Sequence, residues 1–177
     1  ELARDIAQRF NGAYSETFVL PEPLIPKVGA RVMSLQEPTK KMSKSDTNEK
    51  SFVLMTDSAD VIMKKFKSAV TDSDGVVRYD VENKPGISNL MGIYSVMTGR
   101  TVEEIEKEFD GQGYGTFKTA VAQSVIDTLK PVQDEYNRIL ADKAYLEGVL
   151  KDGAEKARYQ ANKLLNKVYR KVGFAQF

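Results

Sequence analysis

The chain has 177 residues, a formal net charge of +1 and 41% hydrophobic residues, which is an ordinary globular composition with enough apolar residues for one sizeable core. It contains no cysteine and no histidine, so disulfides, thiolate or imidazole metal ligands, and catalytic triads built on His or Cys are excluded within it. No apolar run approaches the roughly 18 residues of a membrane span, and the charged N-terminus is unlike a signal peptide. We therefore expect a cytoplasmic protein with no metal site of its own.

The first residues predict a helix that belongs to a longer chain. Leu2, Ile6 and Phe10 recur at a spacing of four, which predicts a helix over residues 1–10 with one apolar face. An Asn-Gly pair follows directly and is typical of a helix C-cap. The chain does not begin with Met, and its first residues resemble the middle of a helix, so we expect part of a longer protein.

Extended and looped structure is predicted between residues 21 and 55. Three prolines occur between positions 21 and 26, and their fixed φ and missing N–H exclude a helix there. The sequence GARVMSL at 29–35 alternates weakly and predicts a short strand. A polar, lysine-rich loop, EPTKKMSKSDTNEK, follows at 37–50.

Helices are predicted for most of the chain after residue 56. Thr101 and Glu104 have the spacing of a capping box, and Pro131 predicts a kink inside a long helix. The buried stripe expected for that long helix is Phe117, Val121, Val125, Leu129, Val132 and Tyr136. The predicted helices run from 57 or 58 to 70, from 86 to 98, from 101, from 116, from 145 to 150 and from 154 to 172.

Charge is distributed unevenly along the chain. Residues 153–177 hold six basic side chains and one acidic side chain, so a basic tail follows an acidic body. At about 100° per residue, four of the basic residues align on one side of the last predicted helix. Such a stripe suits the phosphates of RNA, although a solvated helix face has the same pattern. The candidate RNA-binding residues are Lys156, Lys163, Lys167 and Arg170.

The lysine-rich loop carries side chains that would suit a polyphosphate. Lys41 and Lys44 supply flexible ammonium groups, and the hydroxyls of Ser43 and Ser45 can complete an oxyanion cradle with backbone N–H groups. The loop lacks the glycines of a Walker A motif. A basic surface loop that binds nothing has a similar composition, so the order of the residues has to distinguish the two.

Residues 41–45 read KMSKS, which matches the second signature of the class I aminoacyl-tRNA synthetases at all five positions. The segments GARVMSL, EPTKKMSKSD, AVTDSDGVVRYD, KPGISNL and GYGTFK resemble the bacterial tryptophanyl-tRNA synthetase family in order and spacing. ELARDIAQRFN resembles the helix that follows the GxDQ segment of that family. The resemblance covers essentially the whole chain. The HIGH-type and GxDQ signatures do not occur in it, so we expect a C-terminal fragment that is inactive alone.

The resemblance implies the ATP-dependent attachment of L-tryptophan to its tRNA through tryptophanyl-adenylate. ATP is then a substrate, with Mg²⁺ bound through its phosphates. By the resemblance, Lys41 and Lys44 hold the β- and γ-phosphates and the leaving pyrophosphate. Met42 lies along the adenine, and Ser43 and Ser45 hold the loop and its phosphate hydrogen bonds. This chemistry depends on positioning and charge stabilisation, which suits a chain without His or Cys.

The resemblance also implies a fold and a set of partners. The expected fold is mainly α, with a helical tRNA- and anticodon-binding bundle at 56–177 and the remnant of a Rossmann-like catalytic domain at 1–55. Val32 matches an apolar adenine contact of the family, although core packing explains an apolar residue there equally well. The expected partners are tRNA, ATP and L-tryptophan, whose pocket lies mostly outside this chain. The family works as a homodimer, whereas we expect the fragment to be monomeric.

Two other interpretations compete with this one. Tyrosyl-tRNA synthetase is a close structural relative, but the GARVMSL and TDSDGVVRYD segments favour the tryptophan enzyme. A stand-alone tRNA-binding helical module that retains KMSKS without using ATP belongs to a different functional class. Amino-acid-dependent exchange of pyrophosphate into ATP distinguishes the three.

Overall fold

The computed structural model describes residues 1–25, 29 and 31–175. Pro26 and Ala30, which belong to the predicted extended and strand segments, lie outside them. Within the described residues there are six α-helices and no named strand, which confirms the prediction of a mainly α chain. The helices are α1 Leu2–Ala13, η1 (a 3-10 turn) Glu49–Ser51, α2 Ala59–Lys67, α3 Pro85–Thr98, α4 Val102–Glu108, α5 Tyr114–Ala141 and α6 Lys143–Val172.

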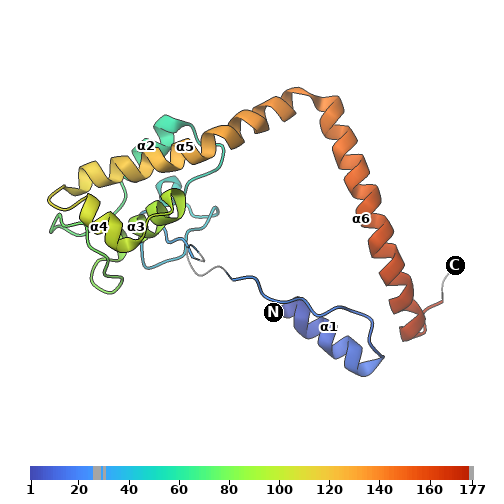
Figure 1. Cartoon of the computed structure of the whole chain (residues 1–177). Coiled ribbons are helices and arrows are strands. Elements are labelled where there is room, and N and C mark those ends of the chain that lie inside the picture. The colour runs from blue at the N-terminus through green and yellow to red at the C-terminus, as the bar shows by residue number, and fades with distance from the viewer. Residues whose placement is uncertain (26–28, 30, 176–177) are drawn as a thin grey trace. The chain divides into compact units, whose positions relative to one another are not determined.

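Residue contacts divide the chain into two compact units, one of residues 26–137 and one that joins residues 1–25 to 138–177. The predicted boundary between residues 55 and 56 concerns the domains of the longer family proteins, and it stays a prediction. In the unit of residues 26–137, the KMSKS segment lies with α2, α3, α4 and the first part of α5 (Figure 1). That unit therefore contains the whole candidate phosphate loop.

The core of this unit lies among α2, α3, α4 and the N-terminal half of α5. Three rings pack edge to face at its centre, with centroid distances of 5.7 Å for Tyr94–Phe109, 5.9 Å for Tyr94–Phe117 and 4.8 Å for Phe109–Phe117. Edge-to-face contacts of this kind add to the stabilisation from burial. The other buried members are Leu35, Ile62, Phe66, Ala69, Val77, Ile87, Leu90, Met91, Ile93, Ile105, Val121, Ala122 and Val125.

The helix ends follow the local sequence closely. Ser58 caps α2 by accepting a hydrogen bond from the Val61 N–H at 3.4 Å. Gly99 ends α3 in the left-handed conformation, with φ at 75°, which glycine adopts without a steric penalty. The predicted capping box at Thr101 and Glu104 is present at the start of α4. These ends are set by neighbouring residues, which is why the sequence alone predicts them.

The strand predicted at 29–35 is wrong for the described residues. Only one residue pair, Met33 and Lys41, forms an antiparallel bridge. The other edge of Met33 is occupied by a side chain of α3 and not by another strand. The weak apolar alternation at 29–35 therefore belongs to a half-buried extended segment, of which only Met33 forms a bridge to another stretch of backbone.

The two helices predicted at 145–150 and 154–172 form one helix, α6. Gly153, which lies between the two predicted helices, is inside α6, since a glycine costs a helix only about 1 kcal/mol. The predicted helix at 1–10 likewise continues to Ala13. In α6, the helix propensity of the residues on both sides of Gly153 exceeds the cost of the glycine.

The buried stripe predicted for the long helix is only partly correct. Phe117, Val121 and Val125 are buried, and Leu129 packs partly against the core. Val132 and Tyr136 are exposed, because the core of residues 26–137 ends before them. The helix continues through Pro131.

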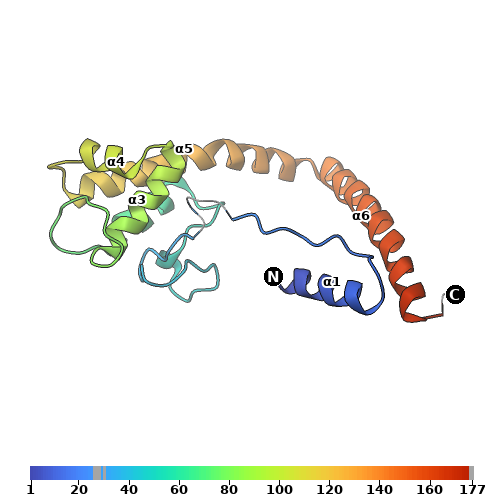
Figure 2. The ribbon, with the colours of Figure 1, turned by 60° about the horizontal axis from the view of Figure 1, so that its bottom comes forward.

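The second unit contains α1 and α6 (Figure 2), and polar contacts form near the end of α1. Asn11 accepts hydrogen bonds from the N–H groups of Thr17 and Phe18 at 2.9 and 3.0 Å, which fixes the turn after the helix. Lys171 of α6 donates to Glu16 O at 3.1 Å and Thr17 Oγ1 at 2.7 Å. No residue of α6 is buried, so the described α6 presents its side chains to solvent.

Candidate phosphate-binding loop

The KMSKS segment begins at the bridge between Met33 and Lys41. The Met42 N–H donates to Val32 O at 3.0 Å, and the Ser34 N–H donates to the carbonyl oxygen of the residue before Lys41 at 2.8 Å. These two bonds flank the Met33–Lys41 pair, so the pair itself is of the non-hydrogen-bonded kind. The first lysine of KMSKS therefore starts from a fixed backbone position.

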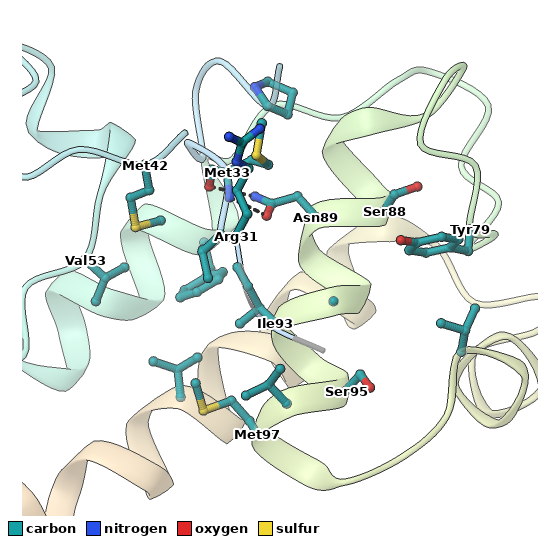
Figure 3. A pocket seen from close by; sticks show the side chains of 18 of the residues that line it. Arg31, Met33, Met42, Val53, Tyr79, Ser88, Asn89, Ile93, Ser95 and Met97 are labelled. Carbon is teal, nitrogen blue, oxygen red and sulfur yellow. Dashed lines mark hydrogen bonds between the residues drawn. The ribbon is translucent and has the colours of Figure 1, made fainter. Parts of the chain in front are cut away.

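Asn89, in the middle of α3, occupies the outer edge of Met33. Its Oδ1 accepts from the Met33 N–H at 2.9 Å, and its Nδ2 donates to Met33 O at 2.9 Å (Figure 3). One primary amide thus satisfies both backbone groups that the bridge leaves unpaired. Asn89 was not predicted as a site residue, because 56 residues separate it from Met33 and no local pattern connects them. Its place in the KPGISNL segment was the only available signal.

The tip of the loop is a short turn held by the two serines. Ser43 Oγ and Ser45 Oγ lie 2.9 Å apart, and the Ser45 N–H donates to Ser43 Oγ at 3.3 Å. The Asp46 N–H donates to Ser43 O at 3.2 Å. The serines therefore bond to each other and to the backbone of the loop, and their expected role towards phosphate stays a prediction.

The lysines of the loop differ in their partners. Lys40 pairs with Glu37, and that carboxylate raises the pKa of the Lys40 ammonium. Lys41 and Lys44 are exposed, and within the described residues no ion pair forms to either. The loop thus presents two ammonium groups whose charge no carboxylate neutralises, which is the arrangement a polyanion requires.

The end of the loop is anchored back to the core. The Leu35 N–H donates to Ser51 O at 3.0 Å, and the Val70 N–H donates to Leu35 O at 2.8 Å. Leu35 is almost fully buried. Both ends of residues 34–51 are therefore fixed on the core, whereas the KMSKS tip between them is exposed.

A cavity of about 1100 Å³ opens beside the base of the loop. Met42 and Val53 line one side, and Asn89, Ile93 and other residues of α3 line the other (Figure 3). Val32 also lines it and has an exposed fraction of 36%. Val32 is therefore not part of the buried core, and it has a free face for an apolar contact.

The predicted RNA-binding residues are placed on α6, in the unit of residues 1–25 and 138–177. Lys156, Lys163, Lys167 and Arg170 are all exposed. Arg170 Nε donates to Asn166 O at 3.1 Å. Among the described residues none of the four forms an ion pair. The stripe expected from helical periodicity is therefore present as an exposed cationic face.

Two further properties concern ligands and membranes. Over the described part of the chain, no group of three or more acidic side chains is placed so that it could hold a metal ion. In the same residues, no helix has both the length and the hydropathy needed to cross a bilayer.

Comparison with known proteins adds to this geometry. A family model described as tRNA synthetases class I (W and Y) matches residues 1–130. A tryptophan–tRNA ligase of Oceanobacillus iheyensis is 53% identical over 176 residues, which are 99% of this chain and 54% of the relative. The chain therefore spans about half the length of that curated relative.

Solved structures show the same similarity. The tryptophanyl-tRNA synthetase from Mycoplasma pneumoniae superposes with a TM-score of 0.85 at 27% identity, over 98% of this chain and 52% of that one. The enzyme from Campylobacter jejuni, complexed with ADP and tryptophan, gives a TM-score of 0.67 at 30% identity, over 98% of this chain and 53% of that one.

Proposed function

The chain belongs to the class I tRNA synthetases of the tryptophan and tyrosine group, and on that premise we propose that it is the C-terminal part of a tryptophan–tRNA ligase. The observation that carries the proposal is the KMSKS loop. Its two lysines are exposed, and among the described residues they have no ion-pair partner on a loop whose base is held by the Met33–Lys41 bridge. The 53% identity to a tryptophan–tRNA ligase supports tryptophan as the amino acid of the proposed reaction.

The proposed chemistry requires charge stabilisation at the phosphates. The tryptophan carboxylate attacks the α-phosphorus of ATP, the bond to the bridging oxygen breaks, and pyrophosphate leaves with the negative charge. Lys41 and Lys44 bind the β- and γ-phosphates and stabilise that charge as it develops. ATP brings Mg²⁺ on its phosphates as part of the substrate. No proton acceptor is needed in this step, which suits a chain without histidine.

The other loop residues have supporting roles. Ser43 and Ser45 keep the tip in a turn through their mutual hydrogen bond and add donors for phosphate oxygens. Met42 and Val32 lie at the cavity beside the loop base, where apolar groups suit the faces of an adenine ring. Nucleotide binding by the Campylobacter jejuni enzyme, seen with ADP, supports this assignment.

The basic face of α6 is proposed to contact tRNA. Four exposed cations on one side of a helix follow a phosphate backbone and make the affinity depend on salt. In the longer protein, residues 1–55 then complete the catalytic domain and residues 56–177 bind tRNA. The tryptophan pocket is contributed mainly by the part of the family protein that this chain does not cover, and the whole protein acts as a homodimer.

The test is exchange of labelled pyrophosphate into ATP. The protein is a chimera in which this chain replaces the matching half of the Oceanobacillus iheyensis relative, with the bare chain measured beside it. Tryptophan-dependent exchange in the chimera, and none in the bare chain, is the expected result. Exchange with tyrosine would assign the chain to the tyrosine enzyme. A well-folded chimera that binds tRNA but never exchanges pyrophosphate would refute the ligase assignment.

A further inference from the structure

The bridge between Met33 and Lys41 leaves one edge of Met33 to be satisfied by something else. In a non-hydrogen-bonded antiparallel pair, the N–H and C=O of each residue point away from the partner strand. A third strand would normally take them, but within the described residues no strand lies there. The side-chain amide of Asn89 takes both, at 2.9 Å each, so it substitutes for a strand.

Asn89 is itself held by a rigid helix. Its neighbours Ile87, Leu90 and Met91 are fully buried in the core. The α3 backbone therefore has little freedom at this position. A fixed amide that bonds both groups of Met33 sets the position and the tilt of the extended segment, and Lys41 is paired with that segment.

We propose that Asn89 is a positioning residue for the KMSKS loop, which acts through the Met33 backbone to place the Lys41 ammonium for phosphate binding. Asn89 also lines the cavity beside the loop, but both polar groups of its amide bond Met33, and the role proposed for it is exerted through these two bonds. The two hydrogen bonds from the Asn89 amide to the Met33 backbone are called the clamp below. The proposed effect on catalysis rests on the proposed ligase function, whereas the clamp itself does not depend on that function.

The alternative is that Asn89 only stabilises the fold. The two roles differ in what they change: a structural role alters folding stability without affecting the rate constant of the folded enzyme, whereas a positioning role affects the reaction step. Misplacement of a charged group relative to the transition state lowers kcat, and it leaves binding of tryptophan, which does not contact the loop, nearly unchanged.

The matched control is the adjacent residue, Ser88. Its Oγ accepts a hydrogen bond from the Asp80 N–H at 2.9 Å, and its side chain is buried on the same helix. Ser88→Ala therefore removes a side-chain-to-backbone bond from α3 without touching Met33. Asn89→Ala removes both bonds to Met33.

The first measurement is amide hydrogen exchange on the bare chain, which needs no enzyme activity. In Asn89→Ala the amides of Ser34 and Met42, which close the bridge, are expected to exchange about tenfold faster, because losing the clamp removes about two ordinary hydrogen bonds. Ser88→Ala is expected to leave both amides unchanged. Unchanged exchange at both amides in Asn89→Ala would overturn the clamp.

The second measurement is tryptophan-dependent pyrophosphate exchange in the chimera described above. Asn89→Ala is expected to lower kcat about tenfold, with KM for tryptophan within about twofold of the parent. Ser88→Ala is expected to retain the parental kcat. Faster amide exchange with an unchanged kcat would overturn the positioning role. A parent chimera without exchange would count against the ligase function, and amide exchange would then decide the clamp by itself.

Asn89→Asp covers the case in which Asn89→Ala does not fold. The carboxylate keeps an acceptor for the Met33 N–H but faces Met33 O without a donor, whereas the protonated acid has both groups, as the amide does. The ratio of variant to parent kcat should therefore rise as the pH is lowered. A ratio that does not change with pH would contradict the need for a donor to Met33 O.

Discussion

Lys65 and Asp57 form an ion pair, with 2.7 Å between Lys65 Nζ and Asp57 Oδ2 and side chains that are only 10% and 12% exposed. The same oxygen accepts the Leu54 N–H at 2.9 Å, and the ammonium lies 5.1 Å from the Phe52 ring centroid. The pair therefore joins α2 to the segment that returns from the loop.

Removal of one partner should cost more than removal of both. Asp57→Ala leaves a buried ammonium unpaired and is expected to lower the free energy of unfolding by about 3 kcal/mol. The double variant Asp57→Ala/Lys65→Met leaves no buried charge and should recover part of that loss. Urea unfolding measures the free energy of unfolding of the two single variants, Asp57→Ala and Lys65→Met, and of the double variant. Lys67→Met, at an exposed lysine of the same helix, is the control. A double variant that loses as much as the sum of the singles would show that the two residues do not interact.

Two glycines of α3 should respond oppositely to alanine. A Cβ at Gly86 would lie 2.2 Å from Val70 O, whereas a Cβ at Gly92 meets nothing within 4 Å. Gly86→Ala should therefore destabilise the protein by about 2 kcal/mol or more, because backbone has to move. Gly92→Ala should stabilise it by about 0.5 kcal/mol through helix propensity. Thermal unfolding of the two variants gives the comparison, and equal effects would contradict the packing at Gly86.

Acid should weaken the contact between residues 72–84 and α5, in which the Tyr114 O–H donates to Asp74 Oδ1 at 2.9 Å. The hydrogen bond from Lys84, and then that from the Val76 N–H, hold the pKa of Asp74 far below its usual range. Because the folded-state pKa is lowered, the ionised carboxylate contributes its full stability above the unfolded-state pKa of about 3.9. This contribution declines as the pH falls below that value and is lost completely only below the folded-state pKa.

The measurement for this contact is urea unfolding between pH 7 and pH 3. Asp74→Asn should be less stable than the parent at pH 7 and should lose less stability on acidification. Lys84→Met, which removes the principal donor, should flatten the pH dependence in the same way. A slope that is identical in the parent and in both variants would show that Asp74 is not responsible for it.

The second lysine of KMSKS should act on the reaction more than on binding. In the chimera, Lys44→Ala is expected to lower the rate of adenylate formation about 100-fold, since charge on the leaving pyrophosphate develops in the transition state. The ATP dissociation constant should change much less. Lys40→Ala, which removes a lysine already paired with Glu37, is the control. Equal losses of binding and rate would exclude a transition-state role for Lys44.

The cationic face of α6 should control the salt dependence of tRNA binding. Lys163→Glu/Lys167→Glu is expected to weaken binding and to reduce the slope of log K against log salt by about 1.5. Lys151→Glu/Arg158→Glu makes the same charge change on the opposite side of the helix and should have a small effect. Equal effects of the two double variants would show that only total charge matters.

Local sequence determined the ends of several helices. The sequence predicted a helix start at 57 or 58, a helix end at 98 and the Thr101–Glu104 capping box, and the structure has the cap at Ser58, the helix end before Gly99 and the capping box. Each satisfies a helix end through contacts within three or four residues. The KMSKS loop and its family were also found from sequence, because the order of residues carries the signature. The roles of the individual loop residues, and of the four cations on α6, stay predictions.

Longer-range features depended on tertiary structure. The buried stripe of α5 stops after Leu129, although the periodic pattern continues to Tyr136, because burial requires a neighbouring helix as well as an apolar residue. Gly153 did not end its helix, because the residues on both sides favour helix. The periodic pattern alone could not show where the buried stripe ends.

The sequence by itself determined a mainly helical chain, a lysine loop of known signature and a basic helix face, because those properties depend on residues that are neighbours along the chain. Only the tertiary structure decided that Asn89 would take the backbone of Met33 and that Lys65 would pair with Asp57 out of solvent. The folding of the core places α3 and α2 beside segments that no local pattern connects to them. Most polar groups that are buried in this way form hydrogen bonds with whichever groups the packing brings near them.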